Sequence, residues 1–252
     1  MRTFGQLLVR GLIVGLFAGL LAGTFAYVLG ESRVDAAIAI EEAGAAHSHD
    51  HDQAHEHGDD HGEEPLVSRE GQKAGLFLAT SLYGVALGGL FAVAYTLLRR
   101  KLGTGNDAYA ALGLAAAGFV GVVLVPFLKY PPNPPAVGDP ETITKRTVTY
   151  LLTLVIGLLA VWAGVALSRW AARYGEVARL AGGVAGLVVT VVAAYLILPR
   201  INEVPESFPA TLLWQFRFAS LGTQATLWLL LGFGYAATVD DHRLTRQKVV
   251  AA

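Results

Sequence analysis

Six long runs of apolar residues, almost free of charge, recur along the 252-residue chain. The hydrocarbon core of a bilayer is about 30 Å thick, and a helix needs about 20 apolar residues to cross it. Each run is long enough, and every Asp, Glu and His lies outside the runs. They cover residues 7–29, 75–98, 108–128, 148–168, 179–198 and 211–237. The pattern predicts an all-α, polytopic membrane helix bundle that forms one integral membrane domain over residues 1–252.

Lys and Arg residues are distributed unevenly over the two sides of this predicted bundle. With six spans both termini lie on one side, which carries eleven Lys and Arg residues, whereas the other side carries seven. Basic residues concentrate in cytoplasmic loops, so we expect both termini in the cytoplasm and the loop 30–74 outside. The first apolar run is longer than that of a secretory signal, which predicts an uncleaved first helix.

The outer loop contains the segment HSHDHDQAHEHGDDH, residues 47–61, with six of the seven histidines of the chain. Imidazole and carboxylate groups are ligands for divalent transition metals, but this run lacks the fixed spacing of a structural zinc site. The predicted ligands are His47, His49, His51, His55, His57, His61, Asp50 and Asp52. The run is too polar to bury a core, so we interpret the loop as a disordered metal-collecting segment, with a solvated spacer as the alternative.

A Pro-rich stretch follows the third apolar run, with five prolines between Tyr130 and Pro140. Proline excludes regular helix here and favours stiff, extended backbone. Asn133, Asp139 and Glu141 are then candidate oxygen ligands near the outer end of the bundle, with Lys145 and Arg146 neutralising or gating them. The alternative is a rigid structural elbow.

The last apolar run contains Arg217, and a charge inside a membrane span normally faces protein or water and has a partner. Glu203, Glu206 and Glu141 are the acids that we expect within its reach. The same run carries Gln224 and several threonines, which predicts that this helix lines an internal cavity. A polar clamp between helices is the alternative.

Glycine recurs every four residues in the first run, at Gly11, Gly15, Gly19 and Gly23. Such a stripe of small residues lets another helix approach closely. It predicts either packing within the chain or a surface for a partner helix.

The composition limits the range of functions. Hydrophobic residues make up 54% of the chain and charged residues 15%, the net charge is −1 and there is no Cys, so neither nucleic-acid binding nor thiolate metal sites are expected. The chain has no H-E-x-x-H, G-x-S-x-G or P-loop motif, and its spans contain no acid–base pair. An enzyme or an organic cofactor is therefore not expected. A metal transporter, or a metal-binding membrane protein for capture, sensing or storage without a permeation path, fits better.

The stretches FLKYPPNPPAVGDPETITKRTVTYL and LPRINEVPESFPATLLWQFRFASLGTQATLW, with the His/Asp loop, resemble the CbtA family of bacterial cobalt transporter subunits. Members of this family are often assigned five spans, whereas we count six. The resemblance implies uptake of Co²⁺ for cobalamin supply across the bacterial plasma membrane. The ligand types of the His-rich loop leave Ni²⁺ or Zn²⁺ as alternative cargo. The resemblance also implies a small single-span, His-containing partner, CbtB; a homo-oligomer and lipid contacts are further expectations. Candidate residues of the metal path or gate are Asn133, Asp139, Glu141, Arg146, Glu203, Glu206, Arg217 and Gln224.

Overall fold

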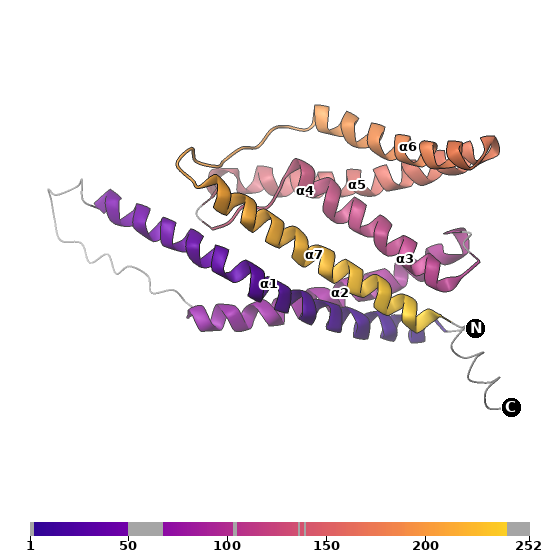
Figure 1. Ribbon diagram of the computed structural model, residues 1–252, viewed down its shortest axis with the longest axis horizontal. Helices are drawn as coiled ribbons and strands as arrows, with labels where there is room; N and C mark the ends of the chain where they lie inside the picture. Colours follow the sequence, from indigo (N-terminus) through magenta and orange to yellow (C-terminus); the bar gives the residue numbers. More distant parts are fainter. Residues whose placement is uncertain (1–2, 50–67, 103–104, 136, 139, 241–252) are drawn as a thin grey trace.

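The computed structural model describes residues 3–49, 68–102, 105–135, 137–138 and 140–240, and every regular element among them is helical (Figure 1). The elements are α1 (Phe4–His49), α2 (Arg69–Leu102), α3 (Asp107–Gly118), η1 (Phe119–Leu124), α4 (Val125–Lys129), η2 (Pro140–Thr142), α5 (Ile143–Ala171), η3 (Ala172–Tyr174), α6 (Glu176–Ile197) and α7 (Ala210–Val239). The predicted all-α bundle is confirmed.

Five helical segments are long and apolar enough to cross a membrane. They are Phe4–Ile40, Arg69–Lys101, Asp107–Lys129, Ile143–Tyr174 and Glu176–Ile197, and they coincide with the first five predicted spans. The sixth predicted span is also a helix, α7, but it is not among these five. Arg217 and Gln224, which lower the hydropathy of α7, also place polar groups inside the bundle.

Helix α1 crosses α2 at very short distance because glycines face each other at the contact. A Cβ atom at Gly15 would lie 2.9 Å from the carbonyl carbon of Gly84, and one at Gly88 would lie 2.9 Å from the Cα atom of Gly15. Gly11 and Gly19 meet α2 in the same way. The glycine stripe of the first predicted span therefore serves packing within the chain.

The third span, Asp107–Lys129, changes its helical geometry halfway. It is α-helical to Gly118, forms the π-helix η1 over Phe119–Leu124 and resumes as α4, where Pro126 is fully buried. A proline inside a helix lacks an N–H donor and its ring crowds the carbonyl four residues earlier. The wider π-turn directly before Pro126 accommodates that ring. Gly121 in η1 also lets the backbone of Gly157 in α5 approach closely.

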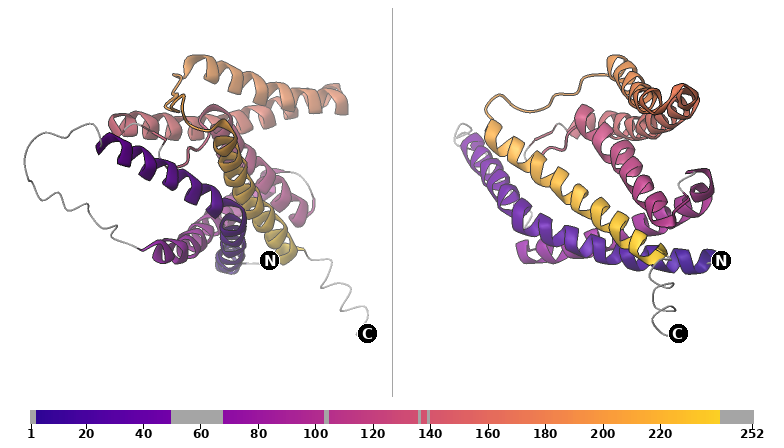
Figure 2. Two further views of the ribbon diagram at one scale, coloured as in Figure 1. Left: turned by 60° about the vertical axis from the view of Figure 1, so that its left-hand side comes forward. Right: turned by 45° about the vertical axis from the view of Figure 1, so that its right-hand side comes forward.

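Helix α7 packs between α1 and α3, whereas α6 lies at the opposite side of the bundle against α5 (Figures 1 and 2). The core around α7 contains Tyr95, Trp228 and Tyr235. Arg10 donates a hydrogen bond to the Thr238 carbonyl, at 2.6 Å, so the beginning of α1 and the end of α7 lie at the same end of the bundle. The Pro-rich stretch lies at the other end, which we call the proline end.

Candidate functional site

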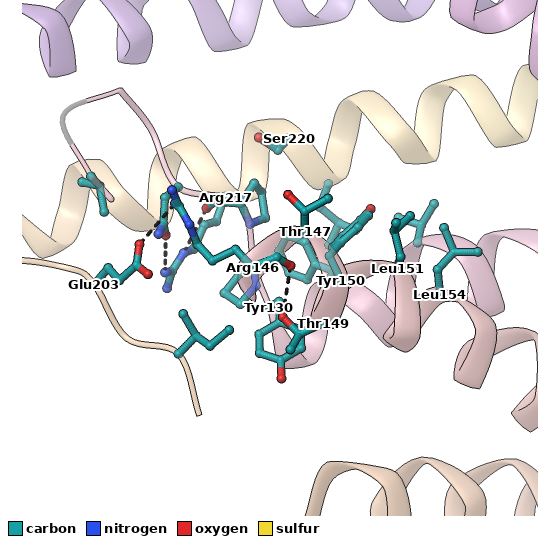
Figure 3. A pocket seen from close by; sticks show the side chains of 18 of the residues that line it. Tyr130, Arg146, Thr147, Thr149, Tyr150, Leu151, Leu154, Glu203, Arg217 and Ser220 are labelled. Carbon is teal, nitrogen blue, oxygen red and sulfur yellow. Dashed lines mark hydrogen bonds and ion pairs between the residues drawn. The ribbon is translucent and has the colours of Figure 1, made fainter. Parts of the chain in front are cut away.

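A cavity of about 940 Å³ opens at the proline end of the bundle. Its wall comes from α2, η1, α4, α5, α7 and the two Pro-rich connections, and Figure 3 shows side chains that project into it. The polar lining residues are Tyr83, Tyr130, Asn133, Arg146, Thr147, Thr149, Tyr150, Asn202, Glu203, Arg217, Ser220 and Gln224. Both Pro-rich stretches that we singled out from the sequence thus border one cavity.

The ends of α4 and α6 are bonded to each other beside the cavity. Lys129 Nζ donates to the Tyr195 carbonyl at 2.9 Å, and the Tyr195 hydroxyl donates to the Val125 carbonyl. The Tyr130 hydroxyl donates to the Pro199 carbonyl at 2.7 Å. Burial raises the pKa of the Tyr130 phenol above its ordinary value of 10.0. These bonds fix both Pro-rich connections relative to each other.

A small apolar cluster packs the same two Pro-rich connections against α1. Ala37 of α1 is fully buried and lies in one cluster with Val137, Phe208 and Leu213, which come from the two connections and the start of α7. The part of α1 beyond the apolar run therefore packs over the proline end. An ion pair of Arg69 with Glu31 and with Asp35, at 2.7 and 2.6 Å, joins α1 to α2 nearby.

Arg146 and Glu203 form an ion pair across the cavity wall. Arg146 Nη1 of α5 lies 3.2 Å from Glu203 Oε2, and the other carboxylate oxygen accepts a hydrogen bond from the Thr142 hydroxyl. The Glu203 side chain is only 11% exposed, so this pair lies largely out of water. Gly138 has a φ of +146°, and a Cβ atom there would lie 2.6 Å from Arg146 Nη1. The glycine of the G-D-P-E-T motif therefore leaves room for the guanidinium group.

Arg217 lies in the same cavity, about two turns into α7, and is partly buried. Its Nη2 donates to Asn133 Oδ1 at 3.0 Å and its Nε to the Pro132 carbonyl at 3.4 Å, while the guanidinium carbon lies 5.3 Å from the centre of the Trp214 ring. Contrary to our expectation, no ion pair links Arg217 to an acid among the described residues, and the carboxylate of Glu203 is bonded to Arg146 and Thr142. An amide, a carbonyl and an aromatic face take the place of an acid.

The structure brings together five of the eight residues predicted for the metal path or gate. Asn133, Arg146, Glu203, Arg217 and Gln224 all line the cavity. Glu141 and Glu206 have exposed side chains and are not part of its wall. Asp139 lies outside the described residues.

The predicted metal ligands of the outer loop lie almost entirely outside the described residues. The backbones of His47 and His49 form the last turn of α1. Asp50, Asp52, His51, His55, His57 and His61 belong to the part of the chain that is not described. Within the described ranges, no group of three or more His, Cys, Asp or Glu residues could hold a metal ion.

Sequence reasoning missed the polar residues that α2 and α5 contribute to the cavity. Tyr83 comes from α2, and Thr147, Thr149 and Tyr150 come from the beginning of α5. A signal for the α5 residues was present, because Arg146 and Tyr150 are four positions apart and so share one helix face. Tyr83 carries no such signal, since its neighbours in sequence are small or apolar.

A helical membrane bundle with a cavity between its spans is an architecture that membrane transport proteins use. The chain belongs to the CbtA family: the family profile described as probable cobalt transporter subunit (CbtA) matches residues 4–240, nearly the whole chain. The comparison with curated proteins and that with solved structures gave no match.

Proposed function

We propose that the chain is the multi-pass membrane subunit of a bacterial uptake system for cobalt, with nickel or zinc as other candidate cargo. The observation that carries this proposal is the cavity of about 940 Å³ that both Pro-rich connections and the polar face of α7 enclose, in a member of a family described as probable cobalt transporter subunits. The cavity forms the outer part of the metal path, and the cell uses the cobalt to make cobalamin.

The His-rich segment 47–61 collects metal outside the membrane before it reaches the cavity. Its six imidazoles and its carboxylates are suitable ligands, and the segment begins in the last turn of α1. The basic residues at the end of the bundle where α7 ends support a cytoplasmic position of both termini. A small single-span subunit with its own histidines completes the system.

Uptake of radioactive cobalt tests this function in cells that express the chain alone or with the single-span partner. We expect accumulation with the partner, because the family is described as a subunit. A chain that binds cobalt at the surface but never delivers it to the cell interior would instead be a capture, sensing or storage protein.

Replacing the six histidines of segment 47–61 by serine, with length and acids unchanged, tests the role of the segment. A flexible collector raises the local metal concentration without forming the obligatory site, so the external cobalt concentration for half-maximal uptake should rise several-fold while the maximal rate remains near normal. As a control, His242 outside the segment is replaced in the same way. Loss of all uptake at saturating cobalt would show that the segment is part of the path itself.

A further inference from the structure

The charged residues of the cavity wall do not suit a bare divalent cation. Among the described lining residues Arg146, Glu203 and Arg217 are charged, which gives one net positive charge. Glu203 is the one acid among them, and both of its oxygens are already engaged, by Arg146 and by Thr142. Divalent cations are held by several carboxylate, carbonyl or imidazole ligands, and Arg217 repels them.

The positive charge of Arg217 is solvated by neutral groups. Its partners are the Asn133 amide and the Pro132 carbonyl, and no carboxylate of the described residues pairs with it. A guanidinium group has five N–H donors in a fixed fork, and two of them make these bonds. The remaining donors are available for an acceptor from outside the chain.

A second polar group lies on the same face of α7. Gln224 is seven residues after Arg217, which is two turns further along α7, and both residues line the cavity, as does Ser220 between them in the sequence. The Gln224 side-chain oxygen is fully buried and has no hydrogen-bond partner within the described structure. The Gln224 amide also interacts with the Tyr83 side chain, so it belongs to the polar lining of the cavity, and the anion site is assigned to Arg217.

We infer that the cavity binds an oxyanion at Arg217, and that the metal enters it as a complex with a small carboxylate instead of as a bare ion. Guanidinium groups bind carboxylate and phosphate oxygens with two parallel hydrogen bonds. A cavity of about 940 Å³ also has the size of a small-molecule site and is far larger than a single ion requires. The part of the inference that concerns the cargo rests on the proposed function, whereas the oxyanion site stands on the geometry alone.

Binding of radioactive citrate and of radioactive phosphate to the purified full chain in phosphatidylcholine nanodiscs tests the site. We expect saturable citrate binding that is weakened at least tenfold in Arg217→Ala, with Arg217→Lys between the two because it keeps the charge but loses the fork. Ser220→Asp, which places a carboxylate one turn from Arg217, should displace citrate while Arg217 is retained. Arg173→Ala, which removes an exposed arginine stacked on Trp170 at the opposite end, is the matched control and should bind like the wild type.

Citrate binding that is the same in the wild type and in Arg217→Ala would overturn the inference. Folding of Arg217→Ala is judged by size exclusion and thermal unfolding. If this variant does not fold, the citrate affinities of Ser220→Asp and Arg217→Lys test the site in its place. An Arg217-dependent preference for phosphate would identify free phosphate as the anion, whereas displacement of citrate by phosphatidylglycerol in the disc would identify a lipid headgroup. Either result would overturn the part that concerns the cargo.

Cobalt uptake separates this inference from the proposed function. We expect uptake to be faster with an equimolar cobalt–citrate mixture than with cobalt chloride in a non-chelating buffer, and we expect Arg217→Ala to abolish that difference. Uptake that proceeds from cobalt chloride alone, with no effect of citrate or of Arg217→Ala, would overturn the inference and leave the transporter intact. Failure of uptake under both conditions would instead contradict the proposed function.

Discussion

Replacing Gly15 by alanine should loosen the crossing of α1 and α2. A Cβ atom at this position would lie 2.9 Å from the carbonyl carbon of Gly84, closer still to its oxygen, and 3.0 Å from the Gly88 Cα atom. The two backbones would have to separate by roughly 1 Å to restore ordinary van der Waals contact, and overpacking of this kind costs about 1–3 kcal/mol. Tyr83, the neighbour of Gly84, lines the cavity, so the displacement also reaches the candidate site.

Thermal unfolding of the purified protein in detergent measures this effect. For a chain of this size 1 kcal/mol corresponds to about 2–4 °C, so Gly15→Ala should lower the midpoint by roughly 2–12 °C. Gly113→Ala is the matched control, since it makes the same replacement inside α3 where a Cβ atom meets nothing within 4 Å. Alanine is the better helix former by about 1 kcal/mol, so this control should be neutral or slightly stabilising. Equal midpoints for the two variants would refute the close crossing.

Three further changes test the site and the topology. Gly138→Ala should displace the Arg146 guanidinium and lower the cobalt uptake rate, since a methyl group there would lie 2.6 Å from Nη1; normal uptake would show that Arg146 has room to move. Glu203→Gln, which breaks a largely buried ion pair, should destabilise the protein by about 2–4 kcal/mol, whereas the exposed Glu206→Gln should change its stability by less than about 0.5 kcal/mol. Ser48→Cys, in a chain without native cysteine, should react with a membrane-impermeant thiol reagent on intact cells; labelling only after permeabilisation would reverse the orientation.

The first five membrane spans could be predicted from the sequence because a run of about 20 apolar residues is a direct physical requirement of the bilayer. The ends of the helices could not be predicted in this way. Helix α1 continues past its apolar run through Glu31 and Asp35, since these acids form ion pairs with Arg69 outside the apolar segment. Hydropathy identifies the part of a helix that lipid solvates and carries no information on its polar continuation.

Some of the residues that line the cavity could be predicted from the sequence, but their pairings could not. A costly charge inside an apolar run marked Arg217, and proline spacing marked the stretch around Asn133, so both could be found without coordinates. We expected Glu203, Glu206 or Glu141 to be the partner of Arg217, yet Glu203 bonds Arg146 of α5. Which of two arginines meets an acid depends on how helices far apart in the chain rotate and cross, and no local pattern records that.

The π-helical segment η1 sets the rotation of the whole outer part of the third span. A π-turn holds about one residue more than an α-turn, and one residue of an α-helix corresponds to a rotation of 100°. If Phe119–Leu124 returned to regular α-helical bonding, α4 and the proline stretch after it would therefore turn by about that angle. Lys129 would leave the Tyr195 carbonyl, and the Pro132 carbonyl and Asn133 would leave Arg217. Six residues without a single charge in the middle of the membrane thus determine which groups of the proline end face the guanidinium of Arg217.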